Sequence, residues 1–203
     1  MSQFTLPLDW PAPESDGFIV GQPNQAAVFL LEDVSGWPVP VALLTGPPRS
    51  GRSLLARRFA AQLPGARVID DAESEDEEAL FHAWNAASAE APLLLVAAAA
   101  PPAWRVALPD LASRLAVTPH ATIAPPDDAL LAALVEKRLI ERGRPAPRTL
   151  IGTIASRIER SYAAIEQTVT MLDRAAGDRL TVALARSLLA PGHGVIDDSS
   201  LPG

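Results

Sequence analysis

The hydrophobic and polar positions divide the chain into a first part that alternates strands with helices and a second part that contains helices only. Short apolar runs predict buried strands at 39–45, 67–71, 93–97 and 121–123. Apolar residues at three- and four-residue spacing predict helices at 24–32, 54–63, 74–87 and 110–115. In the third of these helices, Ser74 and Glu77 have the spacing of a capping box. Alternation of strand and helix up to residue 125 is typical of an α/β domain with a parallel sheet.

After Pro125-Pro126 the pattern changes to helices alone. Apolar stripes predict helices at 127–142, 149–158, 161–175 and 181–189. The first of them has acids in its opening turn and Gly143 after its end, as helix termini favour. We therefore expect an α/β domain over 17–125, followed by a small all-α domain over 127–190.

Neither terminus has the pattern of a folded element. Residues 1–16 are rich in Pro, Asp and Glu, with widely spaced apolar side chains, which indicates an extended arm. Such an arm either packs on its own domain or serves as a docking peptide, and the residues favour neither alternative. Residues 191–203 offer little to bury and are expected to be disordered.

Composition narrows the classes of function. The 203 residues are 48% hydrophobic, which is ample for a folded core. A net charge of −7 argues against a large nucleic-acid footprint, which needs a basic face. Without cysteine, thiolate metal sites and cysteine nucleophiles are excluded, and His82 and His120 are expected on a helix surface and in a loop. No apolar run is long enough to span a membrane and no signal peptide is visible, so we expect a cytoplasmic protein.

The predicted strand at 39–45 runs into a glycine-rich loop and then a helix, the order that a phosphate cradle requires. The loop, Gly46-Pro47-Pro48-Arg49-Ser50-Gly51-Arg52-Ser53, fits the P-loop pattern except that Arg52 stands where lysine is expected. Backbone N–H groups of the loop and of the helix start at Leu54 would bind phosphate, and Ser53 would ligate Mg²⁺. Because arginine differs from lysine in bulk and planarity, we expect nucleotide binding to survive and hydrolysis to suffer. The alternative is a plain glycine turn.

A second candidate motif lies at the end of the predicted strand at 67–71. That strand ends in Asp70 and Asp71, which resemble a Walker B pair, with Asp70 placed for Mg²⁺ and Asp71 for polarising water. Any strand ending in acids looks similar, so the signal gains its value from following a P-loop. The remaining acids up to Glu78 are interpreted as a solvated helix start.

Three further segments, in order with the P-loop, resemble the DnaA-related AAA+ family, and within it the Hda-type regulatory inactivators of DnaA. Phe18-Ile19-Val20-Gly21 with Asn24-Gln25 is similar to the segment that holds the adenine. Leu108 to Leu115 resembles Box VII, which implies that Arg114 is an arginine finger for a neighbour's nucleotide. Gln3-Phe4-Thr5-Leu6-Pro7-Leu8 is similar to the peptide by which these regulators dock on the DNA polymerase sliding clamp.

The chain also departs from that family. The predicted strand at 93–97 ends in alanines where the family carries a polar sensor 1 residue. The sensor 2 arginine position falls on Ala163, so Arg160, about one helical turn away, is the candidate substitute. Too few residues separate Ser53 from Asp70 for the usual second strand and its helix, and we expect an edge strand to be missing.

The resemblance implies an α/β AAA+ P-loop NTPase core with a shortened parallel sheet, followed by a small all-α lid. It implies a clamp-associated regulator that binds ADP or ATP with Mg²⁺ and uses Arg114 to stimulate ATP hydrolysis by DnaA, which prevents re-initiation of replication. The implied partners are the sliding clamp and DnaA, with a homodimer left open and no strong direct DNA binding. Two alternatives stay open, an autonomous AAA+ ATPase (a remodelling or loader subunit) and a nucleotide-free adaptor on the clamp.

Overall fold

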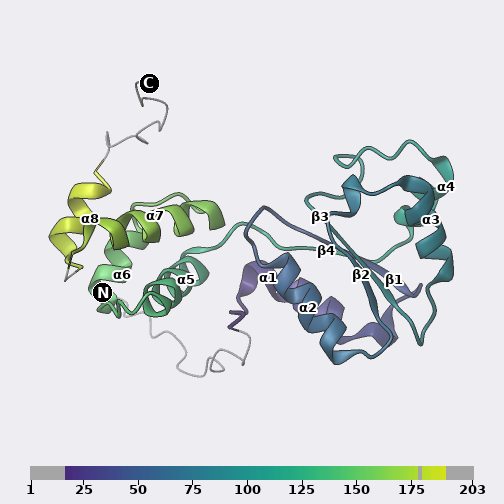
Figure 1. Ribbon diagram of the computed structural model, residues 1–203, viewed down its shortest axis with the longest axis horizontal. Coiled ribbons are helices and arrows are strands. Elements are labelled where there is room, and N and C mark those ends of the chain that lie inside the picture. Colours follow the sequence, from purple (N-terminus) through teal and green to yellow (C-terminus); the bar gives the residue numbers. More distant parts are fainter. Residues whose placement is uncertain (1–16, 178–179, 191–203) are drawn as a thin grey trace, which may run out of the picture.

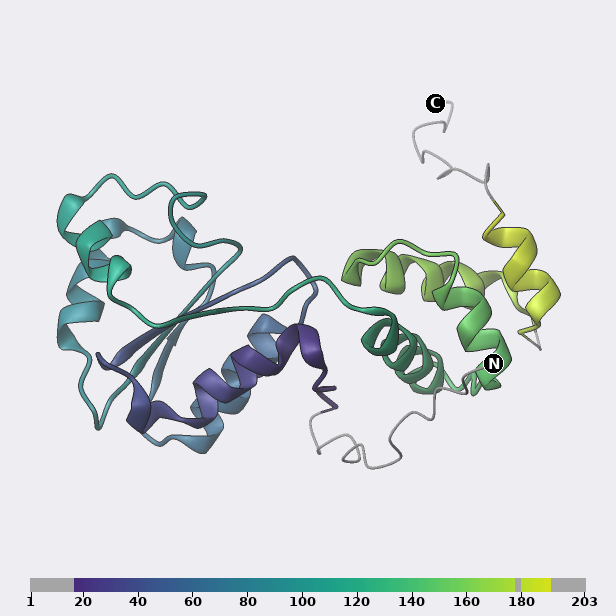
Figure 2. The ribbon, with the colours of Figure 1, turned by 180° about the vertical axis from the view of Figure 1, so that it is seen from behind.

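The computed structural model describes residues 17–177 and 180–190, so the predicted arm and tail lie outside the described residues. The described chain forms two lobes, a sheet lobe and a helical lobe, joined by the segment 123–127 (Figure 1). Figure 2 shows this connecting segment running from the sheet into the first helix of the helical lobe. Among the described residues, no helix is both long and apolar enough to cross a membrane.

The sheet lobe is built on a parallel sheet. Its strands, in the order β2-β3-β1-β4 across the sheet, are β1 (Val41–Thr45), β2 (Arg67–Ile69), β3 (Leu93–Ala97) and β4 (His120–Thr122). Every residue of β1 and β3 is buried, as expected for apolar runs at the centre of a sheet covered on both faces. The four-stranded parallel sheet confirms the predicted α/β class and its shortened sheet, with β2 at one edge.

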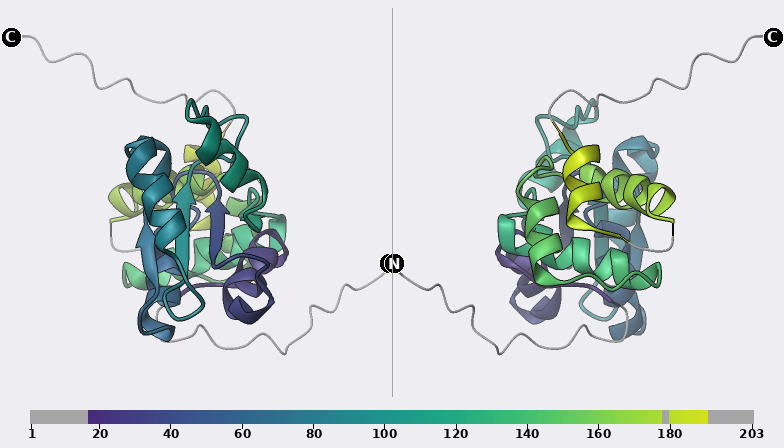
Figure 3. Two further views of the ribbon diagram at one scale, coloured as in Figure 1. Left: turned by 90° about the vertical axis from the view of Figure 1, so that its right-hand side faces the viewer. Right: turned by 90° about the vertical axis from the view of Figure 1, so that its left-hand side faces the viewer.

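Two pairs of helices cover the two faces of the sheet (Figure 3). The helices α1 (Gln22–Glu32) and α2 (Arg52–Gln62) pack on one face, and α3 (Glu77–Ala86) and α4 (Pro109–Ala116) on the other. Side chains alternate along β1, so that Leu44 lies in the first core and Leu43 in the second. Two short 3₁₀ turns, Val34–Gly36 and Ala72–Ser74, complete this lobe.

The acidic segment before α3 differs from the prediction in two ways. Asp76, not Ser74, caps α3, because its side chain accepts a 2.9 Å bond from Ala79 N while Ser74 belongs to the preceding 3₁₀ turn. The acids are also more than a solvated helix start. Glu73 accepts a bond from Ala98 N at 2.7 Å, and Glu77 accepts from Ala107 N and Leu108 N at 2.8 and 2.5 Å. Both carboxylates hold the loop between β3 and α4.

The helical lobe has a core of its own. Its helices are α5 (Asp128–Glu141), α6 (Arg148–Ala155), α7 (Tyr162–Ala175) and α8 (Val182–Leu188), and their inward-facing aliphatic residues are buried together. Side chains of Asp127, Ser161 and Thr181 cap α5, α7 and α8. The helix expected at 149–158 ends at Ala155, since Ser156 Oγ donates to Thr153 O and closes the last turn.

Tyr162 fixes the helical lobe to the connecting segment. Its hydroxyl donates to Ala124 O at 2.9 Å, and Ala124 N donates to Pro23 O of α1 at 2.9 Å. Burial, with a smaller contribution from Asp127, raises the pKa of Tyr162 to about 12, so the phenol keeps its proton at any ordinary pH. The start of α7 is thereby held beside the sheet lobe.

Candidate functional site

The glycine loop (46–53) makes a tight connection between β1 and α2. Gly51 has φ +92°, and a Cβ added there would lie 3.0 Å from the Phe18 ring. A Cβ added to Gly46 would lie 3.0 Å from Ile123 Cβ. Only glycine fits either position without displacement of its neighbours. The contact with Phe18 also brings the predicted adenine segment, 18–21, beside the loop.

Two polar atoms of the glycine loop are buried without a partner. Within the described part of the chain, neither Ser50 Oγ nor Arg52 Nη1 has a hydrogen-bond partner. An unpaired buried polar group costs about 1–3 kcal/mol, and a charged one costs more. The loop also leads into α2, whose N-terminal end favours negative charge. An anion with several oxygens would satisfy both atoms.

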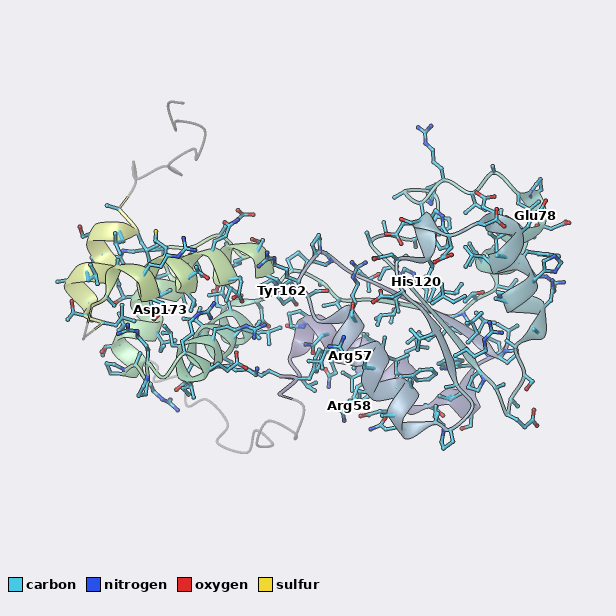
Figure 4. The ribbon with its side chains drawn as sticks, viewed as in Figure 1. Arg57, Arg58, Glu78, His120, Tyr162 and Asp173 are labelled. Carbon is cyan, nitrogen blue, oxygen red and sulfur yellow. The ribbon has the colours of Figure 1, made fainter. Side chains whose placement is uncertain are left out.

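A cavity of about 480 Å³ lies between the glycine loop with α2 and the helices α5 and α7. It is lined by Arg49, Gly51, Arg52, Ser53, Leu54, Arg57, Leu134, Arg138, Tyr162, Ile165 and Glu166. Four of these residues are arginines and one is an acid, although the whole chain carries a net charge of −7. Figure 4 labels two of the residues that line the cavity, Arg57 of the sheet lobe and Tyr162 of the helical lobe. The concentration of arginine suits a polyanion.

Some of the predicted nucleotide-binding residues line the cavity, and the others do not. Arg49, Gly51, Arg52, Ser53 and Leu54 line the cavity. Gly46, Pro47, Pro48 and Ser50 form the rest of the loop, with Gly46 and Ser50 buried. Ile19, Val20 and Gly21 are braced by Asn24, which accepts from Gly21 N at 2.8 Å and donates to Ile19 O at 2.9 Å. Their contact with adenine stays a prediction.

Arg160 pairs with Asp128 of α5. Its guanidinium donates to both carboxylate oxygens of Asp128, at 2.7 and 3.1 Å, and its side chain is 66% exposed. The hydrogen bond from Arg160 lowers the pKa of Asp128 and is the largest cause of that shift. Arg160 does not line the 480 Å³ cavity, and its role as a sensor 2 substitute stays a prediction.

The acidic pair lies at the edge of the sheet. Asp70 and Asp71 follow β2 and are exposed, and Asp71 has a positive φ of 51°. One strand, β3, separates β2 from the strand that leads into the glycine loop. Neither aspartate lines the cavity, and the described residues contain no cluster of three acids or histidines able to hold a metal by themselves. Their roles toward Mg²⁺ and water stay predictions.

Sequence reasoning missed Glu73 at the end of β3. Its Oε1 accepts from Ala98 N, directly after the strand that ends in alanine, and its Oε2 is buried without a hydrogen-bond partner in the described chain. This carboxylate therefore lies at the end of the strand where the chain has alanines and the related family carries a polar side chain. Its position among a run of acids gave no signal that it would fold inward.

Arg114 lies against α3. Leu111 and Leu115 are buried, and the Arg114 guanidinium lies 4.6 Å from the Trp84 ring centroid and 5.8 Å from that of Phe81. Both distances are those of cation–π contacts. The Trp84 ring is itself held in place by a hydrogen bond, in which Trp84 Nε1 donates to Thr118 Oγ1 at 3.0 Å. Action on a neighbour's nucleotide stays a prediction.

His120 is a strand residue and not the loop residue that was expected. Its Nε2 lies 2.7 Å from Thr45 Oγ1 and 3.0 Å from Thr122 Oγ1, at the carboxyl ends of β1 and β4. Burial lowers the pKa of His120, so the neutral ring is favoured in this network. The strand predicted at 121–123 begins one residue earlier in the structure, so His120 became its first residue.

No family model and no curated protein sequence matches the chain. Solved structures do. Domain III of the Thermotoga maritima replication initiation protein DnaA matches with a TM-score of 0.67 at 16% identity, over 85% of this chain and 93% of that one. Replication initiator DnaA bound to AMPPCP and single-stranded DNA matches with a TM-score of 0.64 at 14% identity, over 84% of this chain and 66% of that one. The FIGL-1 AAA domain in complex with ADP matches with a TM-score of 0.58 at 18% identity, over 87% and 82%. These similarities confirm the predicted AAA+ fold class.

Proposed function

We propose that the chain binds a nucleoside di- or triphosphate on the glycine loop. The observation that carries this proposal is the pair of buried, unpartnered atoms, Ser50 Oγ and Arg52 Nη1, beside a cavity with four arginines and one acid. Phosphate oxygens would satisfy both atoms and neutralise the arginines. Among proteins of similar fold, a DnaA binds AMPPCP and the FIGL-1 AAA domain binds ADP.

Ser53, which lines the cavity, would hold Mg²⁺ beside the phosphates, whereas Asp70 lies outside the cavity lining and its role stays a sequence-based prediction. The ion would supply positive charge toward the phosphate oxygens. Hydrolysis by this chain alone is expected to be slow, because β3 ends in Ala97 and is followed by Ala98, where a polar side chain would position water. ADP should therefore stabilise the fold at least as well as ATP.

The test is detection by mass spectrometry of nucleotide released from freshly purified, denatured protein, followed by melting curves with ADP and ATP. We expect bound ADP or ATP and a melting temperature that either nucleotide raises. No released nucleotide and no shift would contradict the proposal and favour the nucleotide-free adaptor. Turnover of ATP by the isolated protein at about 1 s⁻¹ or more would favour the autonomous ATPase.

We further propose that the protein is a clamp-associated regulator that stimulates ATP hydrolysis by DnaA and limits re-initiation. This proposal is supported by the clamp-like hexapeptide, by the Box VII segment with Arg114, and by the similarity of fold to domain III of DnaA. The partners would be the sliding clamp and DnaA. Self-association through the β2 edge stays open.

The clamp contact is tested on the hexapeptide. Replacing Gln3, Leu6 and Leu8 by alanine is expected to abolish binding to the sliding clamp, because the two leucines, extended by Pro7, would fill an apolar pocket with Phe4 beside them. Surface plasmon resonance with immobilised clamp measures this, and the melting temperature should be unchanged. Alanine at Glu14, Ser15 and Asp16 is the matched control. Retained affinity of the first variant would make the arm a structural element of its own domain.

A further inference from the structure

A second hollow of about 750 Å³ lies along α7. It is lined by Arg49 of the glycine loop and by α7 residues between Glu166 and Ala175. We call this surface the α7 groove. It adjoins the 480 Å³ cavity, since Arg49 and Glu166 line both.

Two arginines of the α7 groove have no partner. Neither Arg49 nor Arg174 makes a hydrogen bond or an ion pair within the described part of the chain. Glu166, the acid of the groove, is already neutralised, because Arg138 Nε lies 3.2 Å from Glu166 Oε2 and Arg142 Nη2 donates to Glu166 Oε1 at 2.7 Å. The groove therefore carries an excess of positive charge and suits an acidic ligand.

The groove also has an apolar part. Met171 is 36% exposed, one of the few large hydrophobic side chains of the described chain that remain so, and Ala175 lies one helical turn further along. Methionine and arginine are both enriched in protein interfaces. An exposed methionine beside two unpaired guanidinium groups favours a peptide with adjacent apolar and acidic side chains over an inorganic anion.

The segment 191–203, which lies outside the described residues, contains such a sequence. Val195-Ile196 is followed directly by Asp197-Asp198, the two acids of this segment. Two apolar side chains are too few for a core of their own, which is why composition alone predicts disorder, but they are enough to cover one exposed methionine. The arm at 1–16 has no pair of adjacent acids.

The segment is long enough to reach the whole α7 groove. Figure 4 shows α7 running from Tyr162 toward Asp173, and Figure 1 shows α8 at that end of the helical lobe. The 14 residues of α7 span about 21 Å along the helix axis. Asp198 follows Ala190 by eight residues, which extend to about 26 Å.

From the unpaired charges, the exposed methionine and the reach of the chain, we propose that the segment 195–198 docks in the α7 groove. Its two apolar side chains cover Met171, and its two acids lie between Arg49 and Arg174. The contact needs no nucleotide. Because it engages Arg49, which also lines the 480 Å³ cavity, the docked segment opposes the binding of an anion there, and this consequence rests on the proposed nucleotide site.

Introduced cysteines test the docking in the full chain, because the sequence contains none of its own. With Ser199→Cys and Gln167→Cys, we expect an internal disulfide to form at least about 10-fold faster than with Ser199→Cys and Thr149→Cys, since docking raises the effective concentration at the groove. Thr149 is exposed on α6 of the same lobe and lies outside the groove. Non-reducing electrophoresis with mass spectrometry measures both rates. Equal rates would overturn the docking, and a disulfide between two chains would assign the groove to a second copy instead.

Charge variants test the ionic part of the contact. Asp197→Asn with Asp198→Asn should slow the Gln167 disulfide to the rate of the control pair. Salt at about 1 M, where the Debye length falls to about 3 Å, should do the same. Arg174→Glu should also slow it, whereas Arg157→Glu, at an exposed position outside the groove, should not. An undiminished rate after loss of both acids would overturn the proposed pairing.

Calorimetry with ADP tests the effect on the nucleotide. Asp197→Asn with Asp198→Asn is expected to tighten binding by roughly 10-fold, because a docked segment lowers the fraction of molecules competent to bind. Ser199→Ala with Ser200→Ala is the matched control and should bind like the wild type. Unchanged affinity together with the fast disulfide would overturn the opposition to the nucleotide and leave the docking standing. A fast disulfide in a protein that binds no ADP, with or without the acids, would overturn the nucleotide site and not the docking.

Discussion

Arg52→Ala is expected to abolish measurable binding of ADP and ATP while leaving the fold intact. Arg52 Nη1 is buried at the start of α2 without a partner in the described residues, where a phosphate oxygen would complete its bonding. Two charge-assisted bonds from one guanidinium contribute about 3 kcal/mol or more together, so we expect a loss of at least about 100-fold in affinity. Isothermal titration calorimetry with each nucleotide measures it.

The melting temperature of the nucleotide-free variant gives an independent check. The variant removes Arg52 Nη1, which is buried without a hydrogen-bond partner in the described residues, so nucleotide-free Arg52→Ala should melt at the same temperature as the wild type or higher. Arg67→Ala, in the exposed first position of β2, is the matched control and should bind normally. Equal weak heats for the wild type and Arg52→Ala would show that the glycine loop is vestigial.

The sequence predicted the elements well where one residue pattern dominates. The buried runs at β1 and β3 and the stripes of α5 and α7 were found within two residues of their ends, because apolar periodicity is a direct consequence of burial. Caps were harder. Ser74 and Asp76 both precede α3, and which of them caps it depends on the 3₁₀ turn that places Ser74 outside the helix.

The candidate site was predictable only in its local part. The glycine loop is contiguous in sequence, so its pattern could be recognised. Arg138 and Glu166 join the same cavity from helices that follow the loop by more than eighty residues, and no spacing rule connects them to it. The contacts of Glu77 with Leu108 N and of Arg114 with Trp84 are also long-range, and they depend on how α3 and α4 pack.

Arg114→Ala is expected to remove the ability of the clamp-bound protein to accelerate ATP hydrolysis by DnaA, if the proposed regulatory function holds. An arginine finger is worth roughly 10³ to 10⁵ in rate in well-studied GTPases, or about 4–7 kcal/mol. The contact of Arg114 with Trp84 and Phe81 is worth about 0.5–2 kcal/mol. The gain on reaching a partner's phosphate therefore exceeds the cost of leaving the aromatic rings. Phosphate release in a reconstituted assay with DnaA and clamp on DNA measures the effect.

The melting temperature of the Arg114→Ala variant distinguishes an arginine finger from an arginine that only stabilises the fold. Loss of the cation–π contact is expected to lower the melting temperature by only about 1–8 °C for a chain of this size, and nucleotide and clamp binding should be unchanged. Arg105→Ala, in the exposed loop before α4, should stimulate like the wild type, whereas Arg114→Lys should recover little because lysine lacks the planar fork. Full stimulation by Arg114→Ala would assign Arg114 to the packing of α4 on α3, since a finger cannot be dispensable. The protein would then act on the clamp as an adaptor.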